Sequence, residues 1–185
     1  MRALGLIVLV LLAGVGIAAP AADSDQPGRL AEGKIHYMPP EGWAENRRGG
    51  KFDTVLYLAP DKNAVLSVEA PPDMDDISPA AGGKLIVKLR EMRKAKGQKS
   101  TLGPRVEADN RFDLKIHEKY EFKGKVFDQV HLYRRVGPRI VMVTANALDE
   151  GDRVQKVHEV AEAVALSAAT KGQQPKAPTS RPAPK

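Results

Sequence analysis

The sequence predicts an α/β (α+β) fold, an α-β-α sandwich built on a central, mostly antiparallel sheet with two main helices. Three observations predict it. Short segments rich in β-branched and aromatic residues follow one another across tight turns, which is typical of antiparallel strands. Two longer segments carry apolar residues at helical spacing. The order is strands, helix, strands, helix, which favours helices packed against a sheet.

Residues 1–22 are predicted to be a signal peptide. Arg2 is followed by an uncharged apolar run to Ala19, and small residues up to Ala21 form the cleavage pattern. The alternative is a retained membrane anchor, but the run is shorter than the ~20 residues that a spanning helix needs. We therefore expect cleavage after Ala21 or Ala22, a secreted or periplasmic protein, and no membrane span after cleavage.

The length and composition of the rest of the chain indicate one domain without disulfide bonds. The chain has 185 residues, no cysteine and a formal net charge of +6. Five of the 29 basic residues lie at the two ends of the chain, which leaves 24 against 23 acids, so the body carries about +1. The basic charge therefore belongs mostly to the C-terminal end, which disfavours a nucleic-acid partner for the folded body.

Both ends of the domain are predicted from composition. Residues 23–32 are polar and are interpreted as a linker, and residues 33–169 as the folded domain. Residues 170–185 contain four prolines, no acid and no large apolar residue, so they predict a disordered, Pro/Lys-rich tail.

The first strands precede the first helix. Residues 33–38 form a strand candidate that Pro39 and Pro40 end, because proline cannot donate a ladder hydrogen bond. Residues 54–60 and 64–70 flank a turn-rich joint at 60–63, which indicates a hairpin.

The second group is a three-strand meander. Residues 112–122 alternate apolar and charged positions, and residues 125–136 follow across Lys123-Gly124. Residues 139–147 are apolar on both faces, which predicts a central strand covered on both sides.

The two helices have recognisable ends. Ser78-Pro79 is a favourable N-cap and first-turn pair, and Gly97 ends the pattern of the first helix. Asp149 or Asp152 can cap the second helix. The apolar stripes are Ala81, Leu85, Leu89 and Met92 in the first helix, and Val154, Val157, Ala161, Val164 and Ala168 in the second.

This order, together with the segment "PEGW" (40–43), resembles the PsbP-like superfamily. Its members include the P-type extrinsic subunit of photosystem II, a Ran-binding nuclear transport factor and small bacterial envelope proteins such as DcrB. The resemblance covers residues 33–168 and implies the fold, whereas the roles of the members are diverse. Trp43, the only tryptophan, is interpreted as a core residue, with a ligand-stacking platform as the alternative.

Catalytic motifs are missing from the sequence. There is no thiol, no G-x-S-x-G, no Walker loop and no H-E-x-x-H. The four histidines form no H-x-H or H-x3-H pair, so a zinc site would need long-range convergence, and His158 is interpreted as a local pair with Glu162. The expectation is a protein that is not an enzyme, with no cofactor, no metal site and no catalytic residue.

Glu118 is the exception, because it falls on the apolar side of its strand. If Lys123-Gly124 is a two-residue turn, opposed residues have numbers that sum to 247. The sequence then predicts a polar island in an apolar field, which is an acid/base pair or a ligand anchor. The alternatives are a β-bulge that turns Glu118 outward, a sheet face that is not covered there, or a register shift that separates these residues. The predicted polar island consists of Glu118, Gln129, His131 and Tyr133.

The first helix also presents a basic surface. This surface suits the binding of an anionic envelope component or an acidic protein. The alternative is an outer face that only contacts solvent. The leading interpretation is an exported, non-enzymatic accessory or binding protein of the bacterial cell envelope. The alternatives are a small-ligand or hydrolytic site at Glu118 and His131, and an envelope-surface adaptor that uses the basic helix and tail. The basic residues are Lys84, Lys88, Arg90, Arg93, Lys94 and Lys96.

Overall fold

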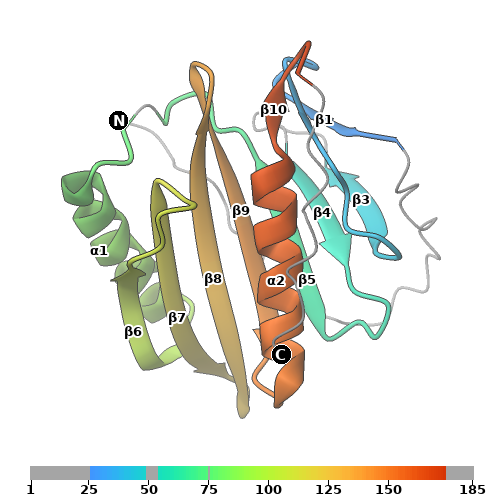
Figure 1. Cartoon of the computed structure of the whole chain (residues 1–185). Helices are drawn as coiled ribbons and strands as arrows, with labels where there is room; N and C mark the ends of the chain where they lie inside the picture. The colour runs from blue at the N-terminus through green and yellow to red at the C-terminus, as the bar shows by residue number, and fades with distance from the viewer. Residues whose placement is uncertain (1–25, 49–53, 75, 174–185) are drawn as a thin grey trace, which may run out of the picture.

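The computed structural model describes residues 26–48, 54–74 and 76–173. Within them the chain forms two sheets and two helices (Figure 1). The elements are β1 (Gly28–Leu30), β2 (Ile35–Tyr37), β3 (Ala44–Arg48), β4 (Thr54–Leu58), β5 (Ala64–Glu69), α1 (Pro79–Ala95), β6 (Lys99–Glu107), β7 (Leu114–Phe122), β8 (Lys125–Val136), β9 (Arg139–Leu148), α2 (Asp152–Ser167) and β10 (Ala169–Thr170).

The main sheet has seven strands in the order β3-β4-β5-β9-β8-β7-β6, and every pairing in it is antiparallel. The predicted α+β class and antiparallel sheet are therefore confirmed. β9 lies fourth of the seven, as its two apolar faces predict. Ile140 packs in the core on one face of β9 and Val141 in the core on the other.

The β7–β8 hairpin has the predicted register. Lys123 and Gly124 form the turn with φ of +52° and +73°, the left-handed conformation at both central residues that two-residue hairpins favour. Glu118 pairs with Gln129 and Ile116 pairs with His131. Because side chains alternate between faces, this register decides which polar residues of β7 and β8 lie together.

α1 covers one face of the β6–β9 half of the sheet. Ser78 Oγ accepts a hydrogen bond from the amide of Ala81, and Gly97 follows the helix at φ +65°, so both predicted ends are confirmed. Leu89 is buried with Ile116 and Ile140 in an apolar cluster on this face.

α2 covers the opposite face, where it packs mainly against β9, with β8 visible beside it in Figure 1. Four of the five predicted stripe residues pack there, namely Val157, Ala161, Val164 and Ala168. Trp43 is buried in the same core, so its interpretation as a core residue is confirmed. The predicted cap is wrong: Gly151 is the N-cap and no side chain bonds there. At the other end of α2, Arg134 Nη1 donates to the carbonyl oxygens of Ala165, Leu166 and Ala168, which ties the helix to β8.

The N-terminal boundary needs a correction. Residues 28–30, assigned to a linker from their polarity, form β1, and Leu30 is fully buried. β1 pairs with β2, which also pairs with β10, so the predicted strand at 33–38 belongs to a separate three-stranded sheet. β3, β6 and β10 were not predicted, and Thr170, which was assigned to the disordered tail, instead pairs with Ile35 as part of β10.

No helix in the described ranges is long and apolar enough to cross a membrane. The predicted signal peptide, 1–22, lies outside the residues that the structure describes. The same holds for the predicted tail from residue 174 onwards.

Candidate functional site

Two polar clusters lie on opposite faces of β7 and β8. The Arg93–Glu118 cluster, on the α1 side, consists of Arg93, Gln98, Glu118, Gln129 and His131. The His117–Asp128–His158 cluster, on the α2 side, consists of those three residues. Since β7 and β8 alternate faces, consecutive residues of each strand serve different clusters.

Arg93 is the centre of the first cluster. Its Nη2 lies 2.5 Å from Glu118 Oε1 and also donates to Gln129 Oε1, while Nη1 donates to Gln98 Oε1 at 2.8 Å. Glu118 Oε1 is also 3.3 Å from His131 Nε2. Both side chains of the ion pair are buried, Arg93 at 3% exposed and Glu118 at 0%. This pair therefore joins α1 to the middle of the sheet inside the core.

The electrostatics of this cluster keep Glu118 ionised. Burial acts to raise the pKa of Glu118, but the hydrogen bonds from His131 and Arg93 and their charges outweigh it and lower the pKa to about 2. The Arg93 guanidinium also lies 3.7 Å from the centre of the Tyr120 ring, a cation–π contact. A carboxylate held this far below neutral is a weak proton donor or acceptor for catalysis at neutral pH.

The structure brings together most of the predicted island. Glu118, Gln129 and His131 meet as the register predicts, whereas Tyr133 belongs to the neighbouring apolar cluster with Leu114. Trp43 packs in the core on the α2 side and so is not part of this cluster.

Arg93 requires a correction, because it was expected on the exposed basic surface and is buried. It follows Leu85 and Leu89 at four-residue steps, so it lies on the inner face of α1. That spacing was the available signal, and the interpretation of Arg93 as one of a run of exposed cations missed it.

The other predicted basic residues do lie outside. Lys84, Lys88, Arg90 and Lys94 are exposed on the outer side of α1, and Lys96 is partly buried. On the edge strand β6, exposed Lys99 and Arg105 pair with Glu121 and His117 and so lie on the other face of the sheet. Val87, at 53% exposed, and Val106, at 50%, lie on the same two elements. The residues Lys84, Val87, Lys88, Arg90, Lys94 and Val106 are called the basic face below.

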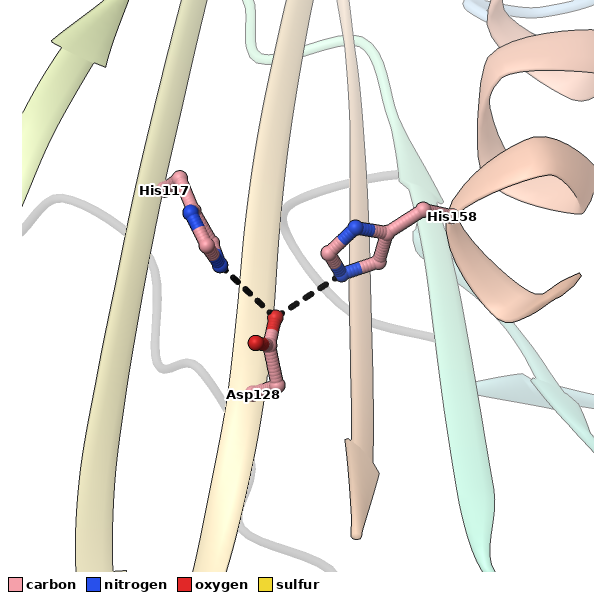
Figure 2. A group of neighbouring side chains, drawn as sticks. All are labelled: His117, Asp128 and His158. Carbon is pink, nitrogen blue, oxygen red and sulfur yellow. Dashed lines mark hydrogen bonds and ion pairs between the residues drawn. The ribbon is translucent and has the colours of Figure 1, made fainter. Parts of the chain in front are cut away.

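The second cluster places two imidazoles on one carboxylate oxygen (Figure 2). Asp128 Oδ1 lies 2.9 Å from His117 Nε2 and 2.9 Å from His158 Nε2. The first contact is a hydrogen bond. The second has the distance of an ion pair but not the direction of a hydrogen bond, so His158 Nε2 has no hydrogen-bond partner among the described residues. The two rings are perpendicular, at 86°.

Charged neighbours surround this cluster. His117 Nδ1 lies 2.9 Å from Glu107 Oε1, and Lys119 Nζ lies 3.1 Å from Asp128 Oδ2 and 2.9 Å from Asp149. The hydrogen bond to Asp128 is the main cause that raises the pKa of His117. Burial acts to raise the pKa of Asp128, but the hydrogen bond from His117 and the His158 imidazole close to the same oxygen hold that pKa well below its usual range.

Sequence reasoning missed this cluster for two reasons. The charged side of β7 was not predicted to contact a helix, whereas His117 and Lys115 on that side reach His158 and Glu162 of α2. The local pair of His158 with Glu162 is wrong, since Glu162 instead pairs with Lys115 at 3.0 Å and with Arg111 at 2.9 Å. The three side chains that could bind a metal ion come from separate elements, β7, β8 and α2, which the fold brings together.

A scan against protein-family models finds no match for this chain, and a search of curated proteins finds none either. Among solved structures, the chain is similar to the cyanobacterial PsbP of Synechocystis sp. PCC 6803, at 15% identity and a TM-score of 0.47, over 88% of this chain and 98% of that one. It is also similar to LpqN, described as involved in cell envelope biogenesis of Mycobacterium tuberculosis, at 14% identity and a TM-score of 0.33, over 82% and 80%.

Proposed function

We propose that this chain is an exported, non-enzymatic accessory protein of the bacterial cell envelope that binds an anionic membrane surface through its basic face. The observation that carries the proposal is the row of exposed cations along the outer side of α1. Lys84, Lys88, Arg90 and Lys94 all project there, and α1 contains a single acid, Glu91.

The charge of this face is local rather than a property of the whole body. The body carries about +1, so a patch of cations at one place implies acids elsewhere. Several of those acids are paired on the opposite side of the sheet: Glu162 with Lys115 and Arg111, and Asp149 with Lys119. Acids paired in this way do not offset the cations of α1, and a local concentration of cations orients a protein on an oppositely charged surface.

Lipid headgroups suit the side chains of this face. Lysine is a point charge on a flexible stem, which attracts an anionic headgroup without requiring one fixed geometry. Each Lys or Arg near an anionic membrane contributes about 1 kcal/mol, so four such residues are enough for measurable binding. Val87 and Val106 add exposed apolar area between the charges.

The Arg93–Glu118 cluster supports a non-enzymatic role. Arg93 donates to three acceptors of its own cluster, and the pKa of Glu118 lies far from neutral. Such an arrangement fixes α1 on the sheet and thereby supports the surface that α1 presents.

Binding to vesicles tests the proposal. We expect the protein to sediment with vesicles of phosphatidylglycerol and phosphatidylcholine, to bind pure phosphatidylcholine weakly, and to lose binding as salt rises. Replacing Lys84, Lys88, Arg90 and Lys94 with glutamine should weaken binding at least tenfold. A control with the same charge change, at exposed Lys34, Lys123, Lys125 and Lys156, should bind as the parent does.

Two results would contradict the proposal. One is an equal loss of vesicle binding in the two quadruple variants, which would show that binding depends on net charge and not on the basic face. The other is the absence of vesicle binding at low salt. A variant that lacks residues 174–185 should keep most of the binding; if it binds no vesicles, the adaptor alternative, in which the tail is required, is the better one.

A small-ligand site at Glu118 is the second candidate, and one observation favours it. Glu118 Oε2, Gln98 Nε2 and Asn146 Oδ1 are buried without hydrogen-bond partners among the described residues. Ligand-observed NMR with a library of small polar molecules tests it. Molecules that bind the parent and not Glu118→Gln would support the candidate, and binding that is absent or unchanged would reject it.

A further inference from the structure

We propose that His117, Asp128 and His158 form a binding site for a divalent first-row transition cation, with Zn²⁺ the best match to the ligands. This site is separate from the basic face and from the proposed function. The three ligand atoms, two imidazole nitrogens and one carboxylate oxygen, all lie within 4.8 Å of one another.

The spacing of the ligand atoms fits such an ion. Zinc ligands of this kind lie about 2.0–2.2 Å from the ion, so neighbouring ligand atoms in a tetrahedral site are roughly 3.3–3.5 Å apart. Asp128 Oδ1 is 2.9 Å from each Nε2 atom, so each separation needs to grow by only a few tenths of an ångström. Rotation of the side chains supplies such a change without movement of the strands.

The orientation of the imidazoles is the second argument. Both histidines direct Nε2 at the same oxygen, yet only the His117 contact has the direction of a hydrogen bond. The arrangement at His158 is therefore poorly explained by hydrogen bonding to Asp128. It is well explained if these atoms are placed to share one ion.

The surroundings complete the pattern of a metal centre. His117 Nδ1 lies 2.9 Å from Glu107 Oε1, which is the carboxylate–histidine contact that commonly orients a metal-bound imidazole. Lys119 lies beside the other oxygen of Asp128, so Oδ1 is the atom left for the ion. Lys119 also pairs with Asp149, which offsets its charge near the site.

The site is open enough for exchange with solvent. The side chains of His117 and His158 are 15% and 20% exposed, whereas Asp128 is buried. Three protein ligands leave at least one coordination position for water or for a ligand from another molecule.

Calorimetric titration of the chelator-treated, untagged full-length chain with ZnCl₂ tests the proposal. We expect one Zn²⁺ per chain. His158→Gln is the most informative variant, because its Nε2 makes no hydrogen bond that the fold would lose, and it should weaken Zn²⁺ binding at least tenfold. Glu107→Gln, which leaves all three ligands in place, should weaken binding about 10–100-fold. His36→Gln is the matched control, since His36 lies on β2, and it should bind as the parent does.

NMR of the parent protein tests the site without any substitution that could change the fold. Addition of Zn²⁺ should shift the Nε2 resonances of His117 and His158 and leave those of His36 and His131 in place. Stoichiometric Co²⁺ should broaden the same two residues, and Zn²⁺ should compete with it. The proposal is overturned if the parent binds no Zn²⁺, if His36 or His131 responds instead, or if folded His158→Gln binds as tightly as the parent.

Discussion

His117 and Glu118 are consecutive residues of β7, and their side chains enter different layers of the protein. His117 contacts Asp128 under α2, and Glu118 contacts Arg93 under α1. One strand thus carries a partly exposed histidine cluster on one face and a fully buried ion pair on the other. Substitutions at these neighbouring positions should therefore have different effects, which separates the two clusters experimentally.

The buried ion pair should show strong coupling. Glu118→Gln or Arg93→Met alone leaves an unpaired polar or charged group in the core and should lower the free energy of unfolding by about 3–5 kcal/mol. The double variant should lose clearly less than the sum of the two single losses. Urea unfolding of all four proteins measures the coupling. Additive losses would mean that the two side chains do not stabilise one another.

Glu69 should reduce stability at neutral pH. It is only 8% exposed at the end of β5, and burial raises its pKa above the usual range, with a smaller opposing effect from Ser67. The folded state therefore binds the proton more tightly than the unfolded state. Ionised Glu69 lowers the free energy of unfolding by its full amount above the pKa of the folded state, and by nothing below the pKa of the unfolded state. Glu69→Gln should raise the melting temperature at pH 7, and by less at pH 4. An equal gain at both pH values would contradict this.

Trp43 should be a major core residue. It is buried with Tyr57 and Val164 in the core on the α2 side. Trp43→Ala should cost about 3–5 kcal/mol of unfolding free energy. Because Trp43 is the only tryptophan, the fluorescence of the folded parent should be blue-shifted and should move to the red on unfolding. Red emission from the folded protein would instead favour the exposed platform.

Arg134 should hold the end of α2. Its Nη1 donates to three carbonyl oxygens there, so Arg134→Ala should lower the free energy of unfolding by about 1–3 kcal/mol. Hydrogen exchange should accelerate in the last turn of α2, including Leu166, and hardly change in α1. Uniform acceleration across the molecule would show a general loss of stability rather than the loss of a cap.

The N-terminal segment should be removed on export. The intact mass of the protein recovered outside the cytoplasm should lack residues 1–21 or 1–22. A full-length mass in the membrane fraction would show that the segment is retained as an anchor. As a control, replacing Ala19 and Ala21 with larger residues should block the cleavage.

The sequence predicted best what depends on local rules. The register of β7 with β8 followed from the two-residue turn at Lys123 and Gly124, so the meeting of Glu118 with His131 could be predicted. The ends of α1 followed from Ser78 and Gly97 for the same reason.

The interactions it missed depend on where helices dock. Nothing in the sequence around His158 indicates which strand α2 will cover, so the contact with Asp128 could not be found from spacing alone. Arg93 was misplaced because arginine is rarely buried unless it is paired, and its partner Glu118 is 25 residues further along the chain.

The central position of β9 constrains the time course of folding. Val68 of β5 pairs with Val143 of β9, which is made 75 residues later. As the chain emerges from a ribosome or a translocation channel, the β3–β5 strands must wait for that partner with one edge of β5 unpaired. Such an edge is a template for intermolecular strand addition, and distant pairings slow the search for the native state. The nascent chain is therefore most prone to aggregate before β9 arrives, and a holding chaperone would be most useful in that interval.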